Sequence, residues 1–334
     1  MPMLFSHTNW NDAQELKSFI PVSSGLSFER VASSLSDAER LFLLPLVGSS
    51  VCSQLSAHYA DPSSSDAETA PIVGEALRES QCAVANLAFY YNYAELQVRI
   101  TDQGAQRQES ESGSFRTPYK YQENALRASF RNKGFNALDR LLGLLDAHSA
   151  LFPGYSSTDA CEERRTSIVR GIEEVNDICC IYGSRILYLR LKPHLRLAEE
   201  TRLLPLVGQR AYDALKGALR SGSSQLQDGA VETLRRLAAR YLVHTAVASL
   251  VRSTGSLTDR GLYFSTLTAG DGDLESRPAS SEERAVASRE EEDAAGRYAT
   301  QLLGYIEETM PTLFAGRPSD ALRRDNTGKK SFWA

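Results

Sequence analysis

The sequence predicts a mainly α-helical protein that contains two copies of one domain. The copies are marked by one hexapeptide, Leu-Leu-Pro-Leu-Val-Gly, which occurs at residues 43–48 and again at residues 203–208. Apolar residues also recur at helical spacing along extended stretches of both copies. Because shorter similarities keep the same order and nearly the same separation, we expect duplication of a whole domain. These similarities join residues 101–104 to 258–261, 141–143 to 302–304, and 151–154 to 313–316.

Length and composition are those of a chain with two ordinary globular domains. A chain of 334 residues, 42% of them hydrophobic and 24% charged, can bury a core in each domain. The formal charge of −5 is mild, so we expect no general attraction to nucleic acid. Residues 1–10 lack the basic start and apolar centre of a secretory signal, and no apolar run approaches the length of a membrane span. We therefore expect no contact with a membrane.

The cysteines and histidines predict neither a metal centre nor an active site. Five cysteines without a close Cys-x-x-Cys pair are typical of reduced, buried thiols in a cytosolic setting. The five histidines share no metal-ligand spacing, and the sequence lacks the common nucleophile and phosphate-binding motifs. We therefore expect no metal, no cofactor and no enzymatic activity. An enzyme whose site these patterns do not reveal is a further alternative.

The landmarks divide the chain into five expected segments. The first contains a helix near residues 11–20, and the segment between the copies contains a helix within residues 158–191 and an extended piece at residues 183–189. The last segment is polar apart from two aromatic residues and is expected to be loose. The segments are an N-terminal helix and arm (1–35), copy one (36–157), a linking helix and extended segment (158–195), copy two (196–317) and a flexible tail (318–334).

The hexapeptide predicts a helix–elbow–helix joint in each copy. In copy one, Ser-Asp-Ala-Glu at residues 36–39 predicts a helix start, because serine caps a helix and early acids favour its positive end. Pro45 should end this helix near Leu44, since proline disfavours the helical conformation of the residue before it. Gly48 should let the backbone turn into a second short helix. We interpret the joint as a packed elbow rather than a ligand-binding loop.

Each copy is expected to continue with a long helix, a β-hairpin and a second long helix. Apolar residues follow one helix face along residues 73–94 and 231–248. Alternation of apolar and polar residues then predicts a strand, followed by a turn and a polar return strand. The expected hairpins are residues 96–114 and 255–268, and the second long helices should begin near residues 117 and 281, the latter after a loop at residues 270–280.

These second long helices carry opposite charges although they occupy matching places in the repeat. Consecutive carboxylates on a helix point to different sides and cannot converge on one metal ion, so we expect them to meet solvent or a partner. One hypothesis is that the basic helix of one subunit contacts the acidic helix of the next. Two solvated faces are the alternative. The candidate interface residues are Arg127, Arg131, Lys133, Arg140, Glu290, Glu291, Glu292, Asp293 and, in the tail, Trp333.

Several segments together resemble a family of uncharacterised proteins from the structural gene clusters of phages and prophages of gut-type bacteria. The resemblance covers about residues 35–315 and consists of pattern and order rather than one diagnostic motif. Copy two lacks a counterpart of the pair Arg107 and Glu109. The segments that carry the resemblance are residues 85–91, 98–104, 132–138, 183–185, 191–193 and 204–208.

Members of that family look like head-to-tail connector or ring proteins of tailed phages, which are small helical proteins beneath the portal. The resemblance implies a structural virion protein that forms a homo-oligomeric ring and links portal and tail proteins. It implies contact with nucleic acid only inside a channel, and it places the protein in the virion and, during assembly, in the host cytoplasm. It transfers no catalytic residue, metal or cofactor. A non-viral helical scaffold or adaptor is the alternative function.

Overall fold

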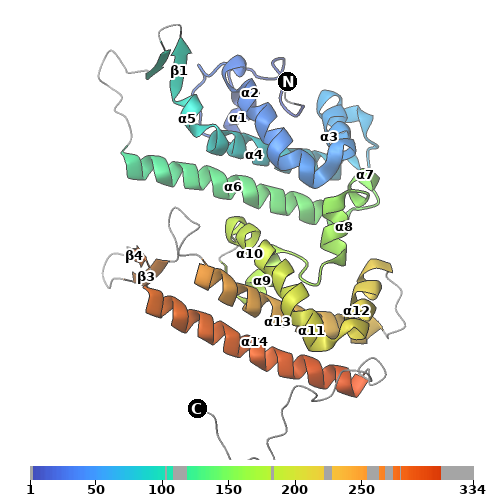
Figure 1. The fold of residues 1–334 in the computed structure, drawn as a ribbon. Helices are drawn as coiled ribbons and strands as arrows, with labels where there is room; N and C mark the ends of the chain where they lie inside the picture. Colours follow the sequence, from blue (N-terminus) through green and yellow to red (C-terminus); the bar gives the residue numbers. More distant parts are fainter. Residues whose placement is uncertain are drawn as a thin grey trace, which may run out of the picture. The chain divides into compact units, whose positions relative to one another are not determined.

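The computed structural model divides the chain into two mainly helical units (Figure 1). Unit 1 comprises residues 1–164 and unit 2 comprises residues 165–334. The structure describes residues 3–101, 104–107, 119–181, 184–221, 228–253, 263–267, 274–278 and 280–309. The tail at 318–334 with Trp333, together with Glu109, lies outside these residues.

Unit 1 is organised around two long helices, α4 and α6, which lie side by side (Figure 1). Their close approach requires Gly134, because a Cβ atom there would lie 2.6 Å from Cγ of Leu87. Leu87 and Leu141 are fully buried between the helices. The elements are α1 Gln14–Lys17, α2 Phe28–Ala38, a π-helical turn η1 Glu39–Leu43, α3 Leu44–Ala60, a 3₁₀ turn η2 Pro62–Ser64, α4 Ala70–Tyr91, α5 Tyr93–Leu96, β1 Val98–Thr101, β2 Gly104–Arg107, α6 Lys120–Ala147, α7 Pro153–Ser156 and α8 Asp159–Thr166, whose last residues enter unit 2.

Unit 2 is organised around α13 and α14, which also lie side by side (Figure 1). Leu242 on α13 and Leu302 and Ile306 on α14 are buried in one apolar cluster with residues of α10. The elements are α9 Ile172–Ile178, α10 Arg185–Ala198, a second π-helical turn η3 Glu199–Leu203, α11 Leu204–Val207, α12 Gln209–Ser221, α13 Asp228–Ser253, β3 Tyr263–Leu267, β4 Leu274–Pro278 and α14 Ser281–Thr309.

The strands form two short antiparallel pairs. In unit 1, β1 pairs with β2 so that Val98 lies opposite Arg107. In unit 2, β3 pairs with β4 so that Tyr263 lies opposite Pro278. The strand β4 falls within residues 270–280, where the sequence predicts a loop. That prediction is wrong because the Gly- and Asp-rich composition extends only to residue 273, and Leu-Glu-Ser-Arg follows.

The helix before the elbow starts earlier than the sequence predicts. It begins at Phe28, and Ser36 lies in its last turns rather than at a cap. Phe28, Val31 and Leu35 follow one face at helical spacing and are all buried. This apolar face, and not the Ser-Asp-Ala-Glu sequence, decides where the helix begins.

Gly48, rather than Pro45, ends the first arm of the elbow. The π-helical turn η1 carries the helix past Leu44, and Pro45 occupies the first turn of α3, where a missing backbone N–H costs little. The chain turns only at Gly48, whose φ of 82° and ψ of 162° favour glycine. The predicted stop near Leu44 is therefore wrong. Gly208 of unit 2 has nearly the same conformation, with φ 82° and ψ 157°.

The segment between the repeats is more helical than predicted. The single helix expected within residues 158–191 is divided into α8, α9 and the start of α10. The extended piece expected at residues 183–189 is wrong, because α10 begins at Arg185. The Ser184 side chain caps this helix by accepting a hydrogen bond from the Leu187 backbone N–H at 3.4 Å. Apolar residues at 186–189 suggested alternation, but the face buried in the core continues at helical spacing to Leu191 and beyond.

One helical stretch, Phe28–Ala60, is long and apolar enough to cross a membrane by length and composition alone. The sequence analysis expected no such run. The stretch includes the π turn and is broken at Gly48, and its residues Val31, Leu43 and Val51 are fully buried within unit 1. Only 33% of its most apolar window is buried in the structure, so core packing accounts for part of its hydropathy.

The N-terminal arm, residues 3–10, is built into the core of unit 1. The Glu39 carboxylate, at the start of η1, accepts hydrogen bonds from the backbone N–H groups of Met3 and Leu4 at 2.8–3.0 Å. The side chain of Leu4 is completely buried. The helix that follows is much shorter than the predicted residues 11–20, because the chain forms α1 only at Gln14–Lys17.

Unit 1 is expected to become more stable as the pH falls from neutrality towards 4.5. Burial raises the pKa of both Glu39 and Glu15 above their ordinary value of 4.5, although hydrogen bonds oppose the shift. Folded unit 1 therefore binds these protons more tightly than the unfolded chain does. The resulting stabilisation is complete below 4.5 and is lost as the pH rises through the raised pKa.

Hydrogen exchange of the arm amides, corrected for the intrinsic effect of pH, measures this dependence. The variants E39Q and E15Q should each flatten it, because each removes one titrating carboxylate. Glu232 of unit 2 provides an internal comparison. Its pKa is lowered by Arg235, so its contribution is lost only as the pH falls below 4.5. A stability of unit 1 that falls between neutrality and pH 4.5, with the same slope in E39Q, would contradict the prediction.

Candidate subunit interface

The basic residues of α6 occupy different surroundings. Arg127 is exposed but folds back onto its own unit, where its Nε donates to the Tyr90 carbonyl at 3.3 Å. Its guanidinium also lies over the Tyr90 ring, 5.3 Å from the centroid. Arg131 donates to the Asn132 side chain next to it at 3.2 Å. The Arg127 side chain is therefore partly engaged by Tyr90 within unit 1. Among the described residues, Arg131 makes a hydrogen bond only to the adjacent Asn132.

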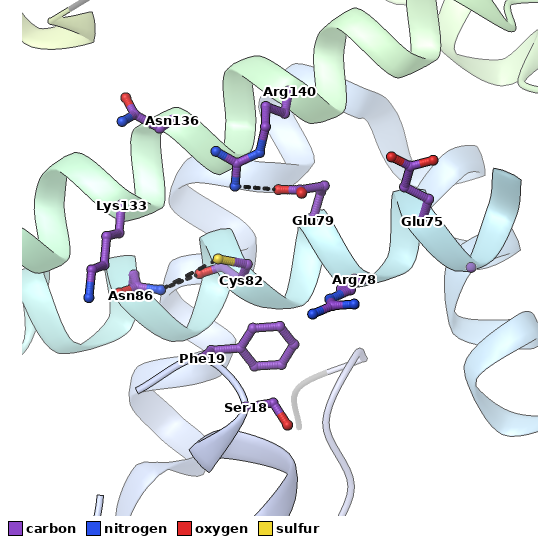
Figure 2. Close-up of a pocket in the computed structure, with 11 residues that line it drawn as sticks. Ser18, Phe19, Glu75, Arg78, Glu79, Cys82, Asn86, Lys133, Asn136 and Arg140 are labelled. Atoms are coloured by element: carbon purple, nitrogen blue, oxygen red, sulfur yellow. Dashed lines mark hydrogen bonds and ion pairs between the residues drawn. The ribbon is translucent and has the colours of Figure 1, made fainter. Parts of the chain in front are cut away.

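Lys133 and Arg140 line a cavity of about 760 Å³ beside α4 and α6 (Figure 2). Arg140 forms a 2.7 Å ion pair with Glu79 of α4, and this pair spans the two helices. Lys133 and Arg78 have no ion pair among the described residues. Among the described residues, the cavity therefore contains two cations without an ion pair, Lys133 and Arg78, beside the Arg140–Glu79 ion pair.

The cavity is also lined by a thiol, an amide and the carboxylates of Glu75 and Glu79. Burial raises the pKa of the Cys82 thiol, so the thiol stays protonated near neutrality. Asn86 donates to the Cys82 carbonyl at 2.8 Å, and its buried Oδ1 has no described hydrogen-bond partner. These groups can contact a polar side chain, and the protonated thiol is not an activated nucleophile.

The acidic run of α14 divides into an inward and an outward pair. Glu291 accepts a hydrogen bond from Nδ1 of His244 at 2.7 Å, and Glu292 pairs with Arg252 at 2.5 Å. Both partners belong to α13 of the same unit. Glu290 and Asp293 are exposed and have no ion pair among the described residues. Because they are three positions apart, these two carboxylates share one helix face.

The structure therefore narrows the set of interface candidates. Glu290 and Asp293 form an outward acidic pair, and Arg131 and Lys133 are the basic candidates without a partner on another element. Glu291, Glu292, Arg127 and Arg140 all contact another helix or its carbonyl within their own unit. Trp333 lies outside the described residues.

The partners of the acidic run, His244 and Arg252, were not predicted from the sequence. His244 and Arg252 lie eight positions apart on α13, and this spacing places both on the side of the helix that meets α14. His244 also stacks on Tyr298 of α14, with ring centroids 5.4 Å apart. The helical spacing of His244 and Arg252 was a signal that could have identified α13 as the partner helix of the acidic run.

The helices α6 and α14 differ in the overall balance of their charged residues. The helix α6 carries five basic and three acidic residues, whereas α14 carries three basic and eight acidic residues. The contrast is therefore one of overall charge between the two helices.

No group of three or more metal-ligating side chains lies together in the part of the chain that the structure describes. Carboxylates here pair with arginine, histidine or backbone N–H groups instead.

Comparison with known proteins gives one match. No curated protein and no solved structure matches the chain. Residues 43–165 match a family of unknown function (DUF6712). The match begins at the elbow and ends in α8, so it lies almost wholly within unit 1. In this segment the chain is similar to a family to which no activity is assigned.

Proposed function

We propose that the protein is a structural subunit that assembles head-to-tail with copies of itself into a ring. The observation that carries the proposal is the opposite charge of α6 and α14, two helices in matching places of the two units. A head-to-tail contact joins unlike surfaces and closes into a ring when the rotation between subunits allows it. Its setting is the head-to-tail connector of a tailed phage or prophage, on the strength of the sequence resemblance.

The proposal includes duplication of one domain, and the elbows support this part. Each unit has a π-helical turn followed by a proline and then a left-handed glycine, and the two copies of this arrangement are separated by 160 residues. A non-helical glycine and a π turn at the same position in both units are unlikely to arise independently. Their shared order favours a common origin.

The duplicated region extends beyond the segments first assigned to it. In unit 1, Gln81 donates to the Leu4 carbonyl at 2.8 Å, and in unit 2 Arg235 donates to the Ile168 carbonyl at 2.6 Å. Both donors lie on the first long helix of their unit, and both acceptors lie in a buried segment that precedes the helices. These bonds support a duplicated unit that begins near residue 165, before the boundary at residue 196 that the sequence suggests.

The proposed contact brings Arg131 and Lys133 of one subunit against Glu290 and Asp293 of the next. All four side chains are described without an ion pair in their own unit. Opposite charges at the edge of an interface select the correct register and speed association more than they add affinity. The contact should weaken as salt rises, because exposed charges are screened over about 8–10 Å at physiological ionic strength.

Charge reversal tests this contact. The variant E290K/D293K should lower the self-association constant about tenfold, since exposed pairs contribute about 0.2–1 kcal/mol each and reversal adds repulsion. Adding R131E/K133E to the same chain should restore much of the association. Sedimentation velocity at low and high salt measures the constant, and electron microscopy shows whether the assemblies are rings.

The control is E307K/E308K, which makes the same charge change near the C-terminal end of α14. It should leave association unchanged, because the proposal attributes the loss in E290K/D293K to the local contact and not to the net charge of the chain. Equal loss in both variants would indicate a general charge effect. A protein that stays monomeric at high concentration and never joins a purified particle would contradict the ring.

A further inference from the structure

We propose that the N-terminal arm, residues 3–10, exchanges between two copies of the chain, so that the arm of one subunit fills the groove of the other. The groove is the surface of unit 1 formed by η1, α3 and α4 that the arm occupies in the structure. The occupant is therefore a segment whose fit to the groove is already visible. This inference does not depend on the contact between α6 and α14.

The arm binds through contacts that any copy of the chain can provide. Glu39 accepts from the backbone N–H of Met3, Ser56 donates to the Met3 carbonyl at 3.2 Å, and Gln81 donates to the Leu4 carbonyl at 2.8 Å. These bonds lie at the base of the groove. Apolar anchoring is equally strong, because Leu4 and Phe5 are 0% and 1% exposed. The contact between the arm and the groove thus combines hydrogen bonds with buried apolar side chains.

The connection between the arm and α1 is strained. Asn11, Asp12 and Ala13 all adopt left-handed backbone conformations, with φ of 38°, 56° and 61°. L-residues other than glycine adopt this region at a cost, and asparagine and aspartate tolerate it best. Ala13 has no such tolerance, and three successive residues of this kind form a short left-handed turn. The turn leads into α1, where the Gln14 N–H donates to the Asn11 carbonyl at 3.0 Å, and it directs the arm into the groove of its own chain.

A chain that extends through residues 11–13 loses the strain but keeps the arm contacts if another copy supplies the groove. Exchange of identical elements between subunits is favoured when the hinge is strained in the closed form. The arm contacts are the same in both forms. The balance between closed and exchanged forms therefore depends on the hinge and on protein concentration.

Unit 2 shows how the same groove is filled without such a hinge. Lys216, at the repeat position of Ser56, donates to the Thr166 carbonyl at 3.0 Å. Glu199, at the repeat position of Glu39, pairs with Lys216 at 3.0 Å. The filling segment follows α8 directly, and no residue with positive φ other than glycine is described between them. The left-handed turn is thus specific to the arm of unit 1.

Mixing two variants of the full chain, each with one added cysteine, detects exchange. One variant carries M3C and the other S56C, and the two residues contact each other in the groove. A short thiol-reactive cross-linker followed by peptide mass spectrometry should show the residue-3 peptide joined to the residue-56 peptide after concentrated incubation. In this mixture the linkage can only join different chains, so the five native cysteines do not confuse it. Absence of the linked peptide after prolonged incubation would overturn the proposal.

Substitutions of the exposed Asp12 test whether the hinge controls exchange. D12P cannot adopt positive φ and should raise the yield of linked peptide several-fold. D12G adopts it freely and should lower the yield several-fold. Equal yields in the two variants would overturn the role of the hinge. If D12P fails to fold, the D12G result alone decides, because glycine retains the closed conformation.

High salt separates this contact from the ring contact of the proposed function. Arm exchange should persist in 0.5 M salt, because the arm is held by buried apolar groups and hydrogen bonds. The contact between exposed charges should weaken, because the screening length there lies between about 3 and 10 Å. The E290K/D293K variant should also retain the linked peptide. Loss of the linkage in that variant would show that the arm moves only within an assembly already joined by α6 and α14, and would overturn its independence.

Discussion

Replacing Gly48 with alanine is expected to lower the local stability of unit 1 by about 3 kcal/mol or more. Two costs combine at this position. The φ of 82° with ψ of 162° is a conformation that essentially only glycine adopts, and an added Cβ would lie 2.7 Å from Cγ2 of Thr158. At Gly208 the backbone is nearly the same, but no atom lies within 4 Å of the Cβ position. G208A should therefore cost only the backbone part, about 1–2 kcal/mol.

Native-state hydrogen exchange of the full chain measures the stability of each unit separately. The double variant G48A/T158S provides the matched control, because serine lacks Cγ2 but retains the hydroxyl that donates to the Tyr155 carbonyl at 2.8 Å. This double variant should regain the stability lost to the steric clash, so that its remaining loss equals that of G208A. Equal effects of G48A and G208A would show that Thr158 adjusts its position without cost.

Replacing Arg235 with methionine is expected to destabilise unit 2 by about 3–5 kcal/mol. Arg235 is 3% exposed and donates to the Ile168 carbonyl at 2.6 Å and to Glu174 at 2.7 Å. Its second amino group pairs with Glu232 at 2.8 Å. Methionine fills a similar volume but leaves the carbonyl and a half-buried carboxylate without their cation. The loss of these partners, rather than the loss of packing, dominates the cost.

The adjacent Arg236 gives the control, because its side chain is exposed. R236M should change stability by less than about 0.5 kcal/mol. In R235M the pKa of Glu232 should also return towards its ordinary value, because Arg235 is the main cause of its lowering. Exchange at the buried Ile168 amide and titration of Glu232 measure the two effects. An R235M protein as stable as the parent would mean that the network contributes no net stability.

The long helices could be predicted because their apolar residues repeat at helical spacing over many turns. The helices α4, α6, α13 and α14 are of this kind. Local signals were less reliable where several residues compete. Pro45 was predicted to stop a helix. The π turn η1 ends just before it, so Pro45 falls in the first turn of α3, where no backbone N–H is needed. The apparent strand at residues 183–189 had too few alternating positions to outweigh a helical face that continues to Leu195.

The charged residues of the candidate interface were visible in the sequence, but their partners were not. A run such as Glu290 to Asp293 turns through more than one face of a helix, so its members must differ in surroundings. Which of them meet His244 and Arg252 depends on how α14 is rotated against α13, and the sequence alone does not specify that rotation. The arm groove escaped prediction because its bonds are mostly to backbone groups, which carry no sequence signal.

The π turns also order events in the history of the chain. A π turn is a helix with one inserted residue, and such insertions are rare. Both units carry one that begins with a glutamate, Glu39 in one and Glu199 in the other, and in both a proline follows within the next helix. On the proposed duplication, the insertion occurred first and was copied with the domain. The ancestor was then a single-unit protein that already had the elbow, and the present two-unit chain takes the place of two ancestral subunits.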